Sequence, residues 1–160
     1  VAACPAEVYL FLHADSRLPA SADADIRRAL IGGYQWGRFD VRIQGRHPLL
    51  PLVARLMNVR SRLTGIATGD HALFVRHELF MSVMGFPELP LMEDIGLCKV
   101  LLRRGRPACL RAVVQTSGRR WDQDGFLRTL GLMWGLRLAY SLGVSPARLA
   151  PLYGDTREQA

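Results

Sequence analysis

Apolar residues recur along this chain with two spacings, one typical of strands and one typical of helices. The run EVYLFL (residues 7–12) is nearly continuous, which predicts a strand buried on both faces of a parallel sheet. The segment YQWGRFDVRI (34–43) alternates, which predicts a strand with Phe39, Val41 and Ile43 on one side. Two further strands are expected in ALFVR (72–76) and PACLRAVVQTS (107–117).

The segments between these strands have helical spacing. Ser21 is placed to cap a helix that runs through about Ile31. In residues 49–63 an apolar stripe recurs with the helical period and predicts the buried face; it consists of Leu49, Val53, Leu56 and Val59. Helices are also expected in residues 77–84, 92–104 and 124 to about 142. Strands that alternate with helices indicate an α/β fold.

Length and composition fit one folded domain. The chain has 160 residues, of which 49% are hydrophobic and 22% charged, and this composition excludes a disordered chain. The net charge is +7, and Lys99 is the only lysine. No acid lies between Asp40 and Asp70, whereas five arginines do: Arg42, Arg46, Arg55, Arg60 and Arg62. We therefore expect a positive potential over this segment.

Cysteines and targeting signals predict the compartment. Cys4, Cys98 and Cys109 lack metal-type spacing, which indicates free thiols in a reducing compartment. The N-terminal residues lack a signal-peptide pattern. The expected location is the cytoplasm, with peripheral contact at the inner face of the membrane as an option.

The segment GFLRTLGLMWGLRLAYSLGV (125–144) is about as long as a membrane span. Arg128 and Arg137 lie inside it, and each would cost about 2.5–3.5 kcal/mol near the bilayer centre, so spanning is not expected. Two alternatives stay open. The helix packs on the sheet, or it lies in the membrane interface with Trp134 and Leu136 dipping in.

Several polar groups follow the predicted strands and are candidates for a site. His13 and Asp15, two residues apart in an extended chain, face the same way at the end of the first strand, where they could hold Mg²⁺ or Mn²⁺. Glu93 and Asp94 begin a helix; they either stabilise its dipole or provide a general base. Gly69 and Asp70 precede another strand, and Arg119, Arg120 and Trp121 follow the last one.

Four segments, taken in order, resemble the family 2 glycosyltransferases. These segments are LFLHADSRLP, WGRFDVRI, TGDHALFVRHELFMSVMGFPELPLMEDIGL and TSGRRW. The resemblance is greatest to a small bacterial subgroup with FLHAD, GGFPE-P-MED and RRW motifs, and it covers residues 9 to 153. It implies a GT-A-like (Rossmann-like), mostly parallel mixed sheet flanked by helices. It also implies a nucleotide-sugar donor, Mn²⁺ or Mg²⁺, and inversion at the anomeric carbon.

The resemblance also implies roles for the candidate residues. Asp15 matches the acid that meets metal and diphosphate, and His13 stands where the family has another acid. Asp94 matches the general base, with Glu93 beside it. Gly69 and Asp70 match positions near the acceptor and donor sugar. Arg119, Arg120 and Trp121 fall at the end of a Q-x-x-R-W element in which Ser117 replaces Gln; the arginines are assigned to the diphosphate and Trp121 to the acceptor.

Family members begin with a strand, a helix and a strand that hold the nucleotide, and only about ten residues precede FLHAD here. We therefore expect an N-terminally truncated fragment lacking that unit. Residues 1–123 would be the C-terminal part of a GT-A catalytic domain, and residues 124–160 a helical segment packed on it or at a membrane. The first strand, Val8 to Leu12, should then present an open edge, and the isolated chain should bind nucleotide poorly.

The acceptor is not named by the sequence, although family 2 enzymes often use lipid-linked ones. Alternative functions are an Arg-rich, non-catalytic module on nucleic acid or anionic lipid, an inactive fragment, or a nucleotidyltransferase. No nucleic-acid motif is recognisable, so nucleic acid is not the expected partner. A nucleotidyltransferase would need a Gly-rich phosphate loop near the N-terminus, where the sequence has none.

Overall fold

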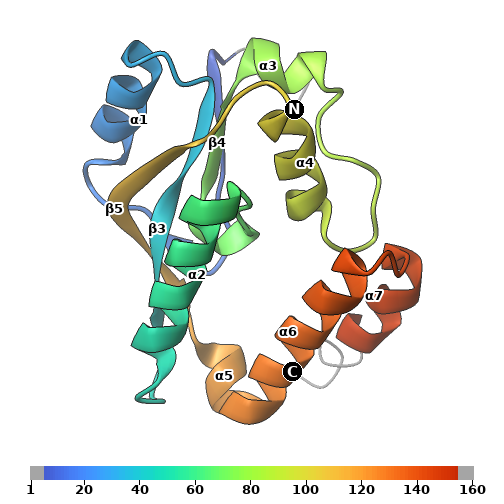
Figure 1. Cartoon of the computed structure of the whole chain (residues 1–160). Coiled ribbons are helices and arrows are strands. Elements are labelled where there is room, and N and C mark those ends of the chain that lie inside the picture. Colours follow the sequence, from blue (N-terminus) through green and yellow to red (C-terminus); the bar gives the residue numbers. More distant parts are fainter. Residues whose placement is uncertain (1–5, 155–160) are drawn as a thin grey trace.

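The computed structural model describes residues 6–154, which form a curled five-stranded sheet flanked by helices (Figure 1). The strands are β1 (Val8–Phe11), β2 (Ser16–Arg17), β3 (Trp36–Gln44), β4 (Leu73–Arg76) and β5 (Ala108–Ser117). The helices are α1 (Ala22–Ile31), α2 (Leu50–Thr64), the 3₁₀ turn η1 (Gly69–His71), α3 (His77–Ser82), α4 (Glu93–Leu102), α5 (Arg119–Gln123), α6 (Phe126–Ser141) and α7 (Pro146–Gly154). The α/β class is confirmed.

The sheet is mixed, and the expectation of a mostly parallel sheet is wrong. The strand order is β1-β4-β3-β5-β2, and of the neighbouring pairs among the described strands β3–β5 is parallel while the other three are antiparallel. In β1, Tyr9 and Phe11 pack with the cluster under α3 and α4, while Val8 and Leu10 pack with the cluster under α1. Apolar neighbours on both faces explain the continuous apolar run, but such a run carries no information about strand direction.

Strand β1 lies at one edge of the sheet. Within the described residues it pairs with β4 alone, so the other edge of β1 is open, as predicted. Its last residue, Phe11, lies opposite Leu73, the first residue of β4. The segment after β1 therefore lies beside the turn η1, which leads into β4.

The side chains of β3 do not share one face. Phe39 packs with the cluster under α1, whereas Val41 and Ile43 pack under α2. The register with β5 shifts between Phe39 and Asp40, and such an irregularity turns the following side chains towards the other face. The alternation in the sequence is regular, so it did not reveal this break.

Helix α2 buries a different stripe from the predicted one. Leu50, Val53, Ala54 and Met57 face the core, and of the predicted stripe only Val53 is buried. Leu49, Leu56 and Val59 are 45%, 49% and 46% exposed. The helix carries two apolar stripes, and contact with Val41 and Ile43 of β3 determines which one is buried.

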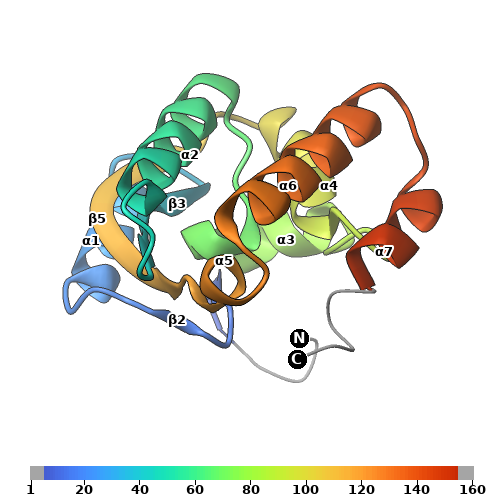
Figure 2. The same ribbon diagram turned by 90° about the horizontal axis from the view of Figure 1, so that it is seen from below.

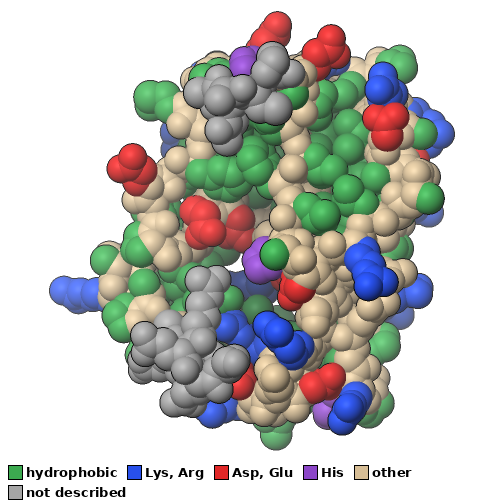
Figure 3. All heavy atoms as spheres, turned by 180° about the vertical axis from the view of Figure 1, so that it is seen from behind, with side chains coloured by type: hydrophobic (Ala, Val, Ile, Leu, Met, Phe, Trp, Pro, Cys, Tyr) green, Lys and Arg blue, Asp and Glu red, His purple; other side chains and the backbone are tan. Residues whose placement is uncertain are grey.

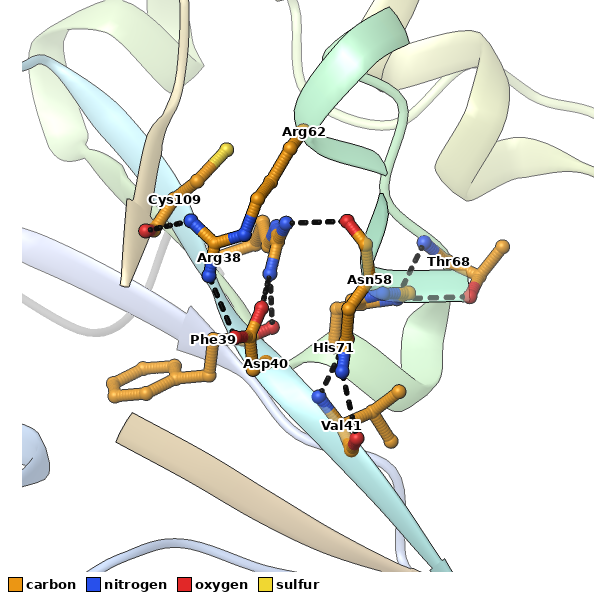
Figure 4. A network of polar contacts seen from close by, with 9 residues as sticks. All are labelled: Arg38, Phe39, Asp40, Val41, Asn58, Arg62, Thr68, His71 and Cys109. Atoms are coloured by element: carbon orange, nitrogen blue, oxygen red, sulfur yellow. Dashed lines mark hydrogen bonds and ion pairs between the residues drawn. The ribbon is translucent and has the colours of Figure 1, made fainter. Parts of the chain in front are cut away.

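A polar network ties α2 to β3 (Figure 4). The guanidinium of Arg38, which is fully buried, donates to Asp40 and to the carbonyl oxygens of Phe39 and Asn58. The side chain of Asn58 in turn bonds both backbone groups of Val41. Asp40 also accepts from Arg62, at 2.6 Å. This network fixes α2 against the sheet, beside the turn that follows it.

Helix α6 packs on the core next to α2 (Figure 2). Leu130 and Met133 contact the α2 cluster, and Leu136 is 4% exposed, so the expectation that Leu136 dips into a membrane is wrong. Trp134 is 58% exposed. None of the described helices combines the length and the apolar character that crossing a membrane requires. The elements β2, α5 and α7 were not predicted.

Of the cysteines, Cys98 is buried and Cys109 half-buried, and both are free thiols. Cys4 lies outside the described residues.

Candidate active site

A cavity of about 880 Å³ opens at the end of the sheet where β1 and β5 stop and β4 starts. Every candidate residue from the sequence lines it: His13, Asp15, Gly69, Asp70, Glu93, Asp94, Arg119, Arg120 and Trp121. Figure 3 shows a hollow on this face with acidic, histidine and basic side chains around it. Segments far apart in the sequence therefore meet in one place.

A chain of side-chain hydrogen bonds joins the segments beneath the cavity. Ser16 of β2 donates to Thr116 of β5 at 3.0 Å, and the hydroxyl of Thr116 donates to Asp70 at 3.2 Å. Gly69, next to Asp70, packs against His13, because a Cβ at residue 69 would lie 3.0 Å from the imidazole Cδ2. A side chain here would displace the histidine, which explains the glycine.

His13 and Asp15 form the predicted pair. Their Nδ1 and Oδ1 atoms lie 3.3 Å apart, and both side chains are about half exposed. Within residues 6–154 no three His, Cys, Asp or Glu side chains are grouped so that they could hold a metal ion. The pair thus fits a Mg²⁺ or Mn²⁺ ion that takes its other ligands from substrate phosphates and water, as Mg²⁺ commonly does, rather than a closed protein cage.

Asp94 is held by the main chain in the first turn of α4. Its Oδ2 accepts from the N–H of Gly69 at 2.8 Å, and its Oδ1 from the N–H of Ile95 at 2.7 Å. Burial raises its pKa above the usual range, partly opposed by these two hydrogen bonds. Met92, just before this turn, has φ +64°, a conformation that residues other than glycine rarely adopt and that is often associated with functional sites.

Asp70 is the second half-buried carboxyl group of the cavity. Burial raises its pKa, while His13 and the hydrogen bond from Thr116 oppose the rise. The turn that carries Asp70 is fixed by His71, whose Nδ1 lies 3.1 Å from the Thr68 hydroxyl. The cavity thus holds two acids in a poorly solvated environment, and such environments are typical of proton-transfer groups.

The residues after β5 also line the cavity. Arg120 lies over the ring of Tyr153, 4.5 Å from its centroid, and 3.9 Å from the Asp124 carboxylate. Trp121 is buried and packs with Val41 as well as lining the cavity, so its indole supports the wall.

Sequence reasoning missed Arg137, which lines the cavity from α6. Its pKa is lowered, chiefly by burial, and Asp94 and Asp70 are close enough to oppose this. In the sequence Arg137 counted only as a charge that disfavours membrane insertion. No local signal distinguishes it from the exposed Arg128 on the same helix.

Comparisons with protein-family models, with curated proteins and with solved structures found no match.

Proposed function

We propose that this chain is the catalytic part of a metal-assisted, inverting glycosyltransferase that uses a nucleoside-diphosphate sugar. One observation carries the proposal: residues chosen from separated motifs line a single cavity, among them the half-buried carboxylate of Asp94 and the two arginines Arg119 and Arg120. The GT-A-like assignment of the mixed sheet belongs to the same proposal.

In this reaction an acceptor hydroxyl oxygen attacks the anomeric carbon, and the bond from that carbon to the diphosphate oxygen breaks. The leaving nucleoside diphosphate takes the electron pair, and the carboxylate of Asp94 takes the hydroxyl proton. Because burial raises the pKa of Asp94, its carboxylate is a stronger base. Because two main-chain N–H groups hold Asp94, the lone pairs that remain on its oxygens keep a fixed direction.

His13 and Asp15 would hold the metal ion, which supplies positive charge to the diphosphate. Arg119 and Arg120, which line the same cavity, would bind the same leaving group through their guanidiniums. Gly69 lets His13 approach closely, and Asp70 lies next to it, where the sugars would meet.

The alternative function, an Arg-rich module on nucleic acid or anionic lipid, has weaker support. Arg62 donates to Asp40 and to the carbonyl oxygen of Cys109, so this guanidinium is engaged inside the fold. If the chain is such a module, the substitution Asp94→Asn should leave ligand binding unchanged. Its binding should also weaken steeply as the salt concentration rises.

The test uses the full-length protein. A nucleoside diphosphate with Mn²⁺ should raise its Tm, and Asp15→Ala should abolish that rise. Asp94→Asn should keep the rise but lower kcat by about 10²–10⁴-fold, the usual contribution of a general base. Asp23→Asn, on the exposed face of α1, is the control and should change neither. No rise with any nucleotide and metal would refute the proposal.

A further inference from the structure

Two arginines lie near Asp94 without an acidic partner. Arg60 comes from α2 and Arg137 from α6, and Arg137 lines the cavity together with Asp94. Within residues 6–154 neither arginine forms an ion pair. The Nε and Nη2 groups of Arg60 are also buried without any hydrogen-bond partner. Buried N–H groups are almost always paired, so this exception needs an explanation.

The charges of these residues interact. Burial, and after it repulsion by Arg137, lowers the pKa of Arg60 to about 10, while Asp94 opposes the change. The fold therefore keeps two guanidiniums that repel each other, with Arg137 in the wall of the cavity and Arg60 outside its lining. This arrangement destabilises the ligand-free protein and favours a bound anion.

Arg38, in the same layer of the fold, is an arginine whose guanidinium has a structural role and can be compared with that of Arg60. Its two terminal nitrogens bond Asp40 and two carbonyl oxygens, as Figure 4 shows. Arg60 belongs to the helix that provides one of these carbonyls, yet both its Nε and one terminal nitrogen, Nη2, lack a partner, whereas Arg38 leaves only its Nε without one. The hydrogen bonds that tie α2 to the sheet thus come from Arg38 and not from these two groups of Arg60.

We propose that Arg137 and Arg60 bind a phosphate group carried by the acceptor, next to Asp94. The assignment of this phosphate to the acceptor rests on the proposed function, whereas the phosphate site itself does not. A phosphate fits better than a carboxylate, because it can neutralise two cations and offers more than two oxygens to the guanidinium forks. The cavity of about 880 Å³ has room for such a group.

Exposed apolar side chains surround this site. Leu56 and Leu63 lie four residues before and three after Arg60, so they share its side of α2. Trp134 lies three residues before Arg137 on α6 and is also exposed. A phosphate on a soluble molecule and one on a lipid both suit these surroundings, and the experiment distinguishes them.

The experiment titrates phenyl phosphate into the full-length protein by calorimetry, in chloride buffer without nucleotide or metal. We expect saturable binding that Arg137→Gln and Arg60→Gln each weaken about tenfold or more, as expected for losing hydrogen bonds to a charged group. Arg128→Gln on the exposed face of α6 should leave it unchanged, whereas binding that Arg120→Gln weakens would belong to the diphosphate site. Absence of saturable phenyl phosphate binding to the folded wild type would overturn the proposal. Binding that is lost in Arg120→Gln but kept in Arg137→Gln would overturn it as well.

Thermal unfolding of the ligand-free variants provides a second measurement. Because the two cations repel each other, Arg60→Gln should keep or raise the Tm; a marked decrease would mean a structural role and would count against the proposal. If Arg137→Gln does not fold, Arg137→Lys replaces it, since lysine keeps the charge but loses the bidentate fork, and it too should weaken binding.

Flotation with phosphatidylcholine vesicles, with and without phosphatidic acid, shows whether the bound phosphate belongs to a lipid or to a soluble molecule. Binding to phosphatidic acid that depends on Arg137 assigns the phosphate to a lipid; binding of phenyl phosphate alone assigns it to a soluble acceptor. Phosphate binding without any response to nucleoside diphosphate and Mn²⁺ would support this site but not glycosyl transfer. The reverse result would support transfer but not this site.

Discussion

The carboxylate of Asp40 is the only acid that compensates the fully buried guanidinium of Arg38 among the described residues, and its removal gives a quantitative test of the fold. Asp40→Asn keeps the shape of the side chain but removes its charge. The amide nitrogen of the new residue would face a donor on Arg38 or on Arg62. One guanidinium then loses both its hydrogen bond and its counter-charge.

The expected magnitude follows from burial. Breaking a buried pair by removing one partner costs about 3–5 kcal/mol. For a domain of this size each kcal/mol lowers the Tm by roughly 2–4 °C, so the variant should unfold about 6–20 °C below the wild type. The change in unfolding free energy is measured by urea denaturation, followed by far-UV circular dichroism.

Two further variants make the test specific. Asp23→Asn removes an exposed ion pair with Arg27, and such pairs contribute about 0–1 kcal/mol. Replacing both Arg38 and Asp40 by apolar residues of similar size should cost less than Asp40→Asn alone, because no buried charge is left unpaired. If Asp40→Asn loses less than about 1 kcal/mol with unchanged circular dichroism, the burial argument is refuted.

Three other predictions follow from the packing and the titration of buried groups. Met57→Ala should destabilise the protein by about 2–5 kcal/mol and Leu56→Ala by about 0.5 kcal/mol or less, since only Met57 faces the core; equal losses in urea denaturation would contradict the assignment of the α2 stripe. Burial lowers the pKa of His71 to about 3. Below about pH 6.5 the unfolded chain therefore binds a proton at His71 that the native protein does not bind. The stability from this neutral histidine is present above pH 6.5 and is lost as the pH falls towards 3, by about 2 kcal/mol between pH 7 and 5. His71→Gln should lack that part of the pH dependence, and equal slopes for both proteins would contradict this. Burial raises the pKa of the Cys98 thiol to about 12, so iodoacetamide at pH 8 should modify half-buried Cys109 before Cys98; peptide mass mapping with the opposite order would disprove it.

Local sequence signals predicted where elements lie better than how they pack. Helix α1 (Ala22–Ile31) could be predicted because its acidic start and the glycines after Ile31 are local signals. The predicted cap is wrong in one respect, because the Ser21 side chain makes no capping hydrogen bond. The direction of β1 could not, because an apolar run reports burial only. The buried face of α2 also escaped prediction, since the helix has two apolar stripes and only the contact with β3 selects one.

The site residues were found from the order of separated motifs rather than from any local spacing, and the structure brings them to one cavity. The arginines were predicted less well. An arginine is assumed to be solvated, so the burial of Arg38 and the position of Arg137 have no sequence signal of their own. Both depend on which elements pack against each other, which the sequence does not state locally.

The main-chain hydrogen bonds to Asp94 have a consequence for how this protein can change over generations. The N–H groups of Gly69 and Ile95 do not depend on the side chains that line the cavity. Substitutions at Met133, which also lines the cavity, can therefore reshape the wall while the carboxylate stays in place. Selection for a new ligand can act on the wall without first losing the proposed general base, which makes this cavity a favourable starting point for directed evolution.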